Sequence, residues 1–147
     1  SENVIQDESG ILTSNVGFID YKNDNLEIGL NLRVPVNTSL SSIKEKYKSL
    51  ENMEVKFSAE QAPLYIPKDS YLIQTLTKIF NEKTGQNAKP IAIGGGTYAR
   101  AFPNCVAFGS NMPGDKDMCH QVDEFIGVDN LITSSKIYAN AIYELAK

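Results

Sequence analysis

Residues 91–124 hold most of the side chains that could do chemistry in this sequence. The stretch contains three consecutive glycines followed by a threonine, one of the chain's two arginines, both cysteines and the only histidine. Four carboxylates lie near that histidine in the sequence: Asp115, Asp117, Asp123 and Glu124. An imidazole among carboxylates suits a metal site or proton transfer, and a glycine turn allows close contact between backbone and ligand. We therefore expect any functional site to include this stretch.

The glycine turn, Gly94, Gly95 and Gly96, follows the apolar run 91–93 and can present its N–H groups to a ligand. Its pattern also satisfies the dinucleotide-binding motif, which needs a helix of normal length behind the turn. Pro103 stops the predicted helix after about two turns, so nicotinamide and flavin are disfavoured. A purely structural turn remains an alternative. Thr97 and Arg100, a hydroxyl and a fixed cation, favour a substrate-contacting loop.

His120 follows a Pro-Gly-Asp turn in a long polar loop, where a core histidine is not expected. A lone histidine is more often packed or solvated than bound to metal, but the nearby carboxylates could orient its ring toward an ion. Equally, those carboxylates could form a solvated loop face. Adjacent residues point apart and no second Cys or His lies nearby, so no catalytic or structural role is expected for Cys119.

The first 60 residues read as strand, strand, helix, strand after a frayed polar start at residues 1–10. Alternating apolar residues predict strands over 11–21 and 26–34, joined by a turn at 22–25. Caps at 37–39 precede a helix with Leu40, Ile43, Tyr47 and Leu50 on one stripe, and residues 53–57 alternate as a third strand. A three-stranded sheet with one helix is marginal alone.

The second half begins after an extended crossing at 58–68 that contains two prolines. Asp69 is predicted to cap a helix that Gly85 ends. The apolar runs 91–93 and 105–108 have the composition of strands buried on both faces. A last helix from Asp129 is expected to pack on them through Leu131, Tyr138 and Ile142, with Leu145 on the same stripe.

Composition narrows the class of protein. The chain has 147 residues, 41% of them hydrophobic and 22% charged, as in a globular sequence. The formal net charge of -4 gives no reason to expect nucleic acid or an anionic membrane as a partner, and no apolar run approaches the roughly 20 residues that span a bilayer. The start of the sequence lacks signal-peptide features and two cysteines are too few for a disulfide scaffold. We therefore expect reduced thiols and a cytoplasmic location.

Several motifs together resemble the C-terminal segment of the dipeptidase V family, di-zinc metallopeptidases with an inserted lid domain. They are Gly94-Gly95-Gly96-Thr97, Pro103-Asn104 before the run 105–108, Pro113-Gly114-Asp115, and His120-Gln121 with Glu124. The resemblance begins near Asn15 and covers most of the chain. In that family the segment is only the last third of a longer protein.

The resemblance implies an α+β or α/β fold. A partial ferredoxin-like lid module (β-β-α-β) would occupy residues 1–60, and the C-terminal part of a mixed-sheet catalytic domain residues 61–147. It implies that His120 binds one of two zinc ions and that Glu124 bonds within that site. It also implies that Arg33, in Leu32-Arg33-x-Pro35, clamps the terminal carboxylate of the substrate, a role suited to a guanidinium and not to lysine. The loop 94–97 and Arg100 would contact the substrate.

One histidine cannot complete a di-zinc site, so no catalytic set is complete in this chain. We expect a dipeptide as substrate of the parent protein, an absent N-terminal catalytic portion, and an isolated chain that is inactive and self-associates. An amino-acid deacylase of the same superfamily and a non-catalytic binding or regulatory module remain alternatives. Dipeptide specificity and the choice between zinc and manganese are open.

Overall fold

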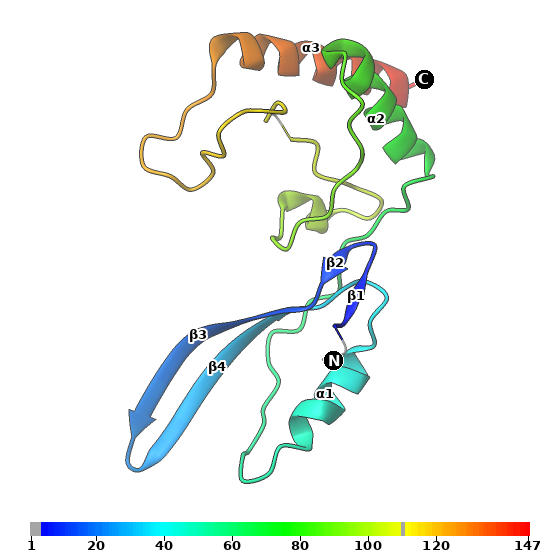
Figure 1. Ribbon diagram of the computed structural model, residues 1–147. Coiled ribbons are helices and arrows are strands. Elements are labelled where there is room, and N and C mark those ends of the chain that lie inside the picture. The colour runs from blue at the N-terminus through cyan, green and yellow to red at the C-terminus, as the bar shows by residue number, and fades with distance from the viewer. Residues whose placement is uncertain (1–3, 110) are drawn as a thin grey trace. The chain divides into compact units, whose positions relative to one another are not determined.

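The computed structural model describes residues 4–109 and 111–147 (Figure 1). They divide into two compact units. The first unit runs to Tyr65 and also takes in Ile91–Gly96, and the second comprises Ile66–Pro90 and Thr97–Lys147. The glycine turn 94–96 therefore packs with the N-terminal unit, although it is far from that unit in the sequence. Among the described residues, none of the helices combines the length and hydropathy that a membrane span needs.

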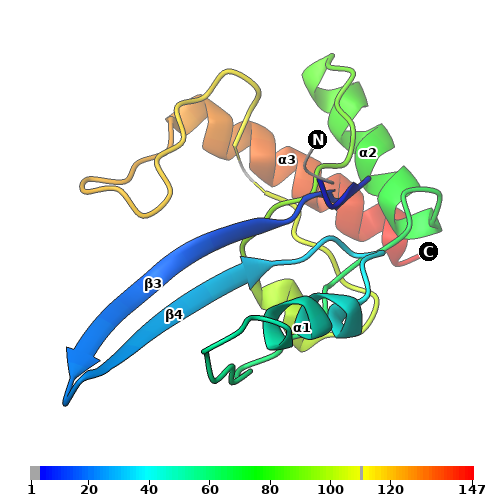
Figure 2. The same ribbon diagram turned by 60° about the horizontal axis from the view of Figure 1, so that its bottom comes forward.

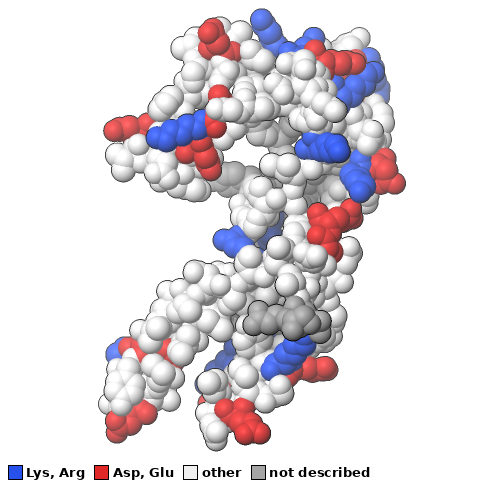
Figure 3. All heavy atoms as spheres, viewed as in Figure 1, with Lys and Arg blue, Asp and Glu red and all other residues white. Residues whose placement is uncertain are grey.

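A long antiparallel hairpin dominates the first unit (Figure 2). It consists of β3 (Thr13–Lys22) and β4 (Asn25–Arg33), with Ile19 opposite Ile28 and a bulge after Val16. Asn23 and Asp24 have φ of 52° and 58°, as a two-residue turn in a tightly twisted hairpin requires. The two strands and the turn predicted from the alternating pattern are confirmed. Figure 3 shows charged side chains of both signs at the hairpin tip and an uncharged stretch behind it.

A second, shorter hairpin precedes the long one. It pairs β1 (Gln6–Asp7) with β2 (Gly10–Ile11). The expectation that the start of the chain is frayed is therefore wrong from residue 6 onward, and its first three residues lie outside the described part. The turn between the strands is held by Asp7, whose Oδ1 accepts hydrogen bonds from the backbone N–H and the hydroxyl of Ser9 at 2.7 and 2.6 Å.

Helix α1 (Leu40–Lys48) completes the regular part of this unit. Ser39 caps it by accepting a hydrogen bond from the backbone N–H of Ser42, and Ile43 is the buried residue of its stripe. Residues 53–57, predicted as a third strand, form no ladder with any described residue. No described strand lies beside this segment to pair with it. Lys44 of α1 instead contacts the ring of Phe57 and forms an ion pair with Glu60.

Two crossing helices form the second unit, α2 (Tyr71–Thr84) and α3 (Val128–Leu145), seen in Figures 1 and 2. Ser70, one residue after the predicted cap, accepts from the backbone N–H of Ile73, and Gly85 ends α2 with φ of 68°. The helices are also linked by a hydrogen bond from the Tyr71 hydroxyl to the carbonyl of Glu144. The core between them consists of Leu76, Ile79, Ile137 and Ala141, with Leu72, Phe80, Val106, Phe108 and Met112 packed around it.

The packing predicted for α3 is correct for Tyr138, whose ring contacts Phe108 of the run 105–108, and wrong for Leu131 and Ile142, which are 51% and 69% exposed. The residues that α3 buries are Ser134, Ile137 and Ala141. The buried face is rotated from the predicted stripe because α2 packs on the side of α3 that carries Ile137 and Ala141.

The run 91–93 also differs from the prediction that it forms a buried strand. It forms no strand, and Ile91 is 86% exposed, because no described strand lies beside it to cover it. The run 105–108 is also not a strand, although Val106 and Phe108 do pack on the helical core. Between the two runs lies the short 3-10 helix η1 (Tyr98–Ala101). The fold class and the domain boundaries of the longer protein stay predictions.

Candidate functional site

Arg33 is the last residue of β4 and pairs with Thr13 across the hairpin. The chain that follows it is held by the small β1–β2 hairpin. The backbone N–H of Val36 donates to the hydroxyl of Ser9 at 3.0 Å, and that of Asn37 donates to Oδ2 of Asp7 at 2.6 Å. Arg33 thus lies between a strand ladder and a clamped loop, and its backbone position is determined from both sides.

The sequence analysis did not predict a role for Asp7 or Ser9 in the candidate site. The hydrogen bond from the Ser9 hydroxyl, then that from the Asn37 backbone, lowers the pKa of Asp7 below its ordinary value of 3.8. An Asp followed two residues later by Ser and then Gly is the sequence signal of such a turn. What the sequence does not indicate is that this carboxylate also reaches Asn37.

The side chain of Arg33 lies against the glycine turn of the same unit. A β-carbon placed on Gly94 would be 2.8 Å from Cδ of Arg33, 3.0 Å from Nη1 and 3.3 Å from Nε. At Gly95 the same addition meets nothing within 4 Å. Of the residues predicted to bind substrate, the structure therefore brings Arg33 and Gly94 together. Arg33 is exposed, and among the described residues no carboxylate pairs with it.

Thr97 and Arg100 belong to the second unit, where they flank η1. Thr97 precedes the short helix, its hydroxyl makes no capping hydrogen bond, and its carbonyl accepts from the backbone N–H of Arg100 at 3.2 Å. A shallow, mainly apolar hollow of about 320 Å³ adjoins this segment. It is lined by Thr97, Tyr98, Ala99, Phe102, Cys105, Val106 and Ala107. The hollow offers hydroxyl, thiol and apolar groups, and its lining contains no carboxylate or imidazole.

His120 lies at a turn of the long loop before α3, with φ of 62° and an exposed side chain. Left-handed backbone is uncommon at a histidine, and Asp123 adopts it as well, with φ of 59°. Asp115 does not orient the imidazole as expected. Its carboxylate instead accepts from the backbone N–H of Met112 and from the side-chain amide of Asn130.

Asp117 forms its hydrogen bonds with Cys119, and His120 adds only a smaller electrostatic effect that also lowers the pKa of this carboxyl. Its Oδ1 accepts from the Cys119 backbone N–H at 3.0 Å, and this bond lowers the pKa of the carboxyl. The thiol of Cys119 also bonds to Asp117, which raises the pKa of the thiol above its ordinary value of 9.0. A raised thiol pKa disfavours the thiolate, which is the nucleophilic form. The geometry therefore gives no support to a cysteine nucleophile at this loop.

A metal site requires several converging ligands, and the described residues contain no group of three or more His, Cys, Asp and Glu side chains placed to hold an ion. His120 has carboxylates near it in the sequence, but Asp115 and Asp117 are committed to backbone and amide donors. The described part of this chain does not by itself fit a zinc or di-zinc centre, and we derive no catalytic step through one.

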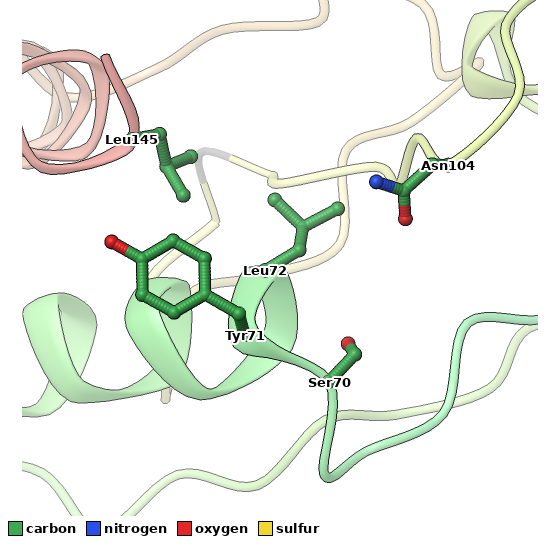
Figure 4. A pocket seen from close by; sticks show the side chains of 5 residues that line it. All are labelled: Ser70, Tyr71, Leu72, Asn104 and Leu145. Atoms are coloured by element: carbon green, nitrogen blue, oxygen red, sulfur yellow. The ribbon is translucent and has the colours of Figure 1, made fainter. Parts of the chain in front are cut away.

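Another hollow in the second unit contains none of the predicted site residues (Figure 4). It has a volume of about 340 Å³ and is lined by Ser70, Tyr71, Leu72, Asn104 and Leu145. No side chain that ionises near neutral pH faces it, so it lacks the groups for hydrolysis. The arrangement with the clearest chemistry is the exposed guanidinium of Arg33 beside the glycine turn.

Comparison with known proteins gives a consistent family. The model of the peptidase family M20/M25/M40 matches residues 4–144. A Bacillus subtilis protein named "Putative dipeptidase YtjP" is 42% identical over 140 residues, covering 95% of this chain and 30% of the relative. A Staphylococcus saprophyticus protein named "Putative dipeptidase SSP1012" is 36% identical over 144 residues, with the same coverage of each. The chain thus spans under a third of the length of these relatives.

Proposed function

The chain belongs to the peptidase family M20/M25/M40, and from that premise we propose that it is part of a zinc-dependent dipeptidase. The proposal is supported by relatives whose names contain the word dipeptidase and by the motifs that resemble dipeptidase V. In this proposal the chain contributes part of a lid and the end of a catalytic domain. The remaining metal ligands and the catalytic base come from sequence outside this chain.

The observation that carries the proposal is the state of Arg33. Its guanidinium is exposed at the end of β4, lies beside Gly94, and has no carboxylate partner among the residues described. A guanidinium without a protein partner presents paired N–H donors that match a carboxylate. We assign to it the free terminal carboxylate of a dipeptide.

The other roles rest on the resemblance and are part of the same proposal. His120 is one ligand of the metal site, with Glu124 bonding inside that site. The turn from Gly94 to Gly96, together with Thr97 and Arg100, contacts the bound dipeptide. The exposure of His120 is compatible with a partner from outside the chain, because the ring makes no hydrogen bond to a described residue that would have to be broken first.

The test compares a dipeptide with its C-terminal amide in the full-length protein that contains this chain. Arg33→Lys keeps the charge and removes the fork, so kcat/KM for the dipeptide should fall roughly tenfold or more, the worth of a charged, two-point hydrogen bond. The amide, which lacks the carboxylate, should lose little. Lys46→Met, which removes an exposed charge from α1, is the matched control. Equal losses on both substrates would remove Arg33 from carboxylate recognition.

The same assay can distinguish a dipeptidase from the alternative, an amino-acid deacylase. An N-acyl amino acid carries the same free carboxylate, so Arg33 serves either substrate and does not choose between them. The ratio of kcat/KM for dipeptides to that for N-acyl amino acids makes the choice. Hydrolysis of neither class by a metal-loaded protein would favour a binding module.

A further inference from the structure

We propose that Gly94 is a positioning residue whose missing side chain creates the seat for the guanidinium of Arg33. The inference deepens the proposed function, on which its catalytic consequence rests. It gives Gly94 a second role, besides the substrate contact proposed for the whole turn. In this view the substrate carboxylate meets Arg33, and Arg33 is held in place by the backbone of the glycine turn.

The seat is visible in the distances. A β-carbon on Gly94 would approach Cδ of Arg33 to 2.8 Å, well inside the 3.5–4.0 Å at which carbon atoms pack. Nη1 and Nε would be 3.0 and 3.3 Å away, so the approach involves the guanidinium as well as its stem. Any residue other than glycine at position 94 therefore competes with Arg33 for the same space.

The backbone of Gly94 does not itself require glycine. Its φ is outside the left-handed region, as is that of Gly95, so alanine fits either position without backbone strain. The atoms that a methyl group at position 94 would meet belong to the end of a flexible side chain. The expected response to Gly94→Ala is thus a displaced Arg33 in a folded chain. Gly95→Ala adds the same methyl group one residue later, into open space, and is a matched control.

The chain has only two arginines, so its chemical reactivity gives a direct readout. Phenylglyoxal modifies guanidinium groups, and mass spectrometry of the digested chain gives the modification rate of Arg33 relative to Arg100. In Gly94→Ala this ratio should rise at least about twofold, because a side chain released from packing samples more exposed rotamers. In Gly95→Ala it should remain at the wild-type value. Equal ratios in the two variants would overturn the seat.

A double-mutant cycle covers the case in which Gly94→Ala damages the fold. If the methyl group acts by displacing Arg33, the thermal destabilisation caused by Gly94→Ala should disappear in an Arg33→Ala background. The same loss of stability with and without the Arg33 side chain would show that the methyl group meets something else, and the seat would be rejected.

Kinetics of the full-length protein test two claims independently: that Gly94 makes room for Arg33, and that Arg33 binds the substrate carboxylate. With both correct, Gly94→Ala raises KM for a dipeptide more than it raises KM for the C-terminal amide, and this difference between the two substrates disappears in an Arg33→Lys background. A shifted Arg33 reactivity without any such KM effect supports the seat and contradicts the carboxylate role. Normal Arg33 reactivity in Gly94→Ala, with Arg33→Lys impaired, contradicts the seat and supports the role.

Discussion

The side-chain amide of Asn130 donates to both carboxylate oxygens of Asp115, at 2.9 and 2.8 Å. One of those oxygens, Oδ2, also accepts from the backbone N–H of Met112 at 2.9 Å. A single carboxylate thereby joins the start of the polar loop to the first turn of α3. The loop segment between them, which carries His120, is closed at its base.

Asp115→Asn should loosen this loop. An amide offers one acceptor in place of two and directs an N–H₂ group toward the donors of Met112 or Asn130, so the free energy of local opening should fall by about 1 kcal/mol. Hydrogen exchange of the Met112 backbone amide measures this free energy of opening, and its exchange rate should rise in the variant. Asp123→Asn removes the same charge at a left-handed position that Asn tolerates, and Asp123 makes no hydrogen bond to a described residue that would be lost. Equal effects of the two variants would refute the closure by Asp115.

Tyr138 links stability to alkaline pH. Its hydroxyl donates to the carbonyl of Phe108 at 3.1 Å, and burial raises its pKa above the ordinary value of 10.0. The folded state therefore keeps the phenol proton at a pH where the unfolded state releases it. Its contribution is complete below about pH 10 and is lost as pH rises through the higher folded pKa. Denaturant unfolding between pH 8 and about pH 11 should show this loss.

Tyr138→Phe should flatten that part of the pH profile and cost about 1 kcal/mol near neutral pH, the typical worth of a hydrogen bond. Tyr98→Phe is the control, since Tyr98 is 97% exposed and the substitution removes the same hydroxyl from a side chain that lies in water. A profile for Tyr138→Phe that still falls as steeply as the wild type would exclude Tyr138 as the source.

Zinc should bind the isolated chain only weakly. A single imidazole and carboxylates that already accept hydrogen bonds do not form a closed site, and no suitable group of ligands exists among the described residues. Calorimetric titration should therefore show no stoichiometric high-affinity event, and zinc should leave the thermal midpoint unchanged. Nanomolar binding at one site per chain would contradict the proposal that the other ligands lie outside it.

The isolated chain should self-associate through the long hairpin. Ile19 and the opposite Ile28 are 66% and 48% exposed, and both edges of the two-stranded sheet lack a neighbour among the described strands. Ile19→Lys should shift light scattering at micromolar concentration toward the monomer. Ser14→Lys, which adds the same charge to an exposed polar position of β3, should have a smaller effect. A wild-type chain that stays monomeric would argue against this surface.

The local elements follow from local patterns, and this is why the sequence predicted them. Apolar alternation over 26–34 with Asn23 and Asp24 before it leads to a hairpin, because side chains alternate across a strand and these two residue types tolerate positive φ. Gly85 ends α2 for the same kind of reason, since it adopts the left-handed conformation without a β-carbon.

Other features depended on which surfaces meet. Helix α3 carries apolar residues on more than one side, and contact with α2 selected Ile137 and Ala141 over Leu131 and Ile142. The runs 53–57 and 91–93 have strand composition, but a strand requires a paired neighbour, and the described chain provides none. Composition therefore indicated what these segments can form, and the available partners decided what they do form.

The sequence by itself determined the residue types of the candidate site: an arginine in a strand, a three-glycine turn, and one histidine in an acidic loop. Only the tertiary structure decided that Arg33 lies on Gly94, that Asp7 holds Asn37 beyond the end of β4, and that Asp115 bonds Asn130 instead of orienting His120. The physical reason is distance along the chain. Caps and turns are determined by neighbours a few residues away. The contacts named above instead join segments that come together only when each unit folds.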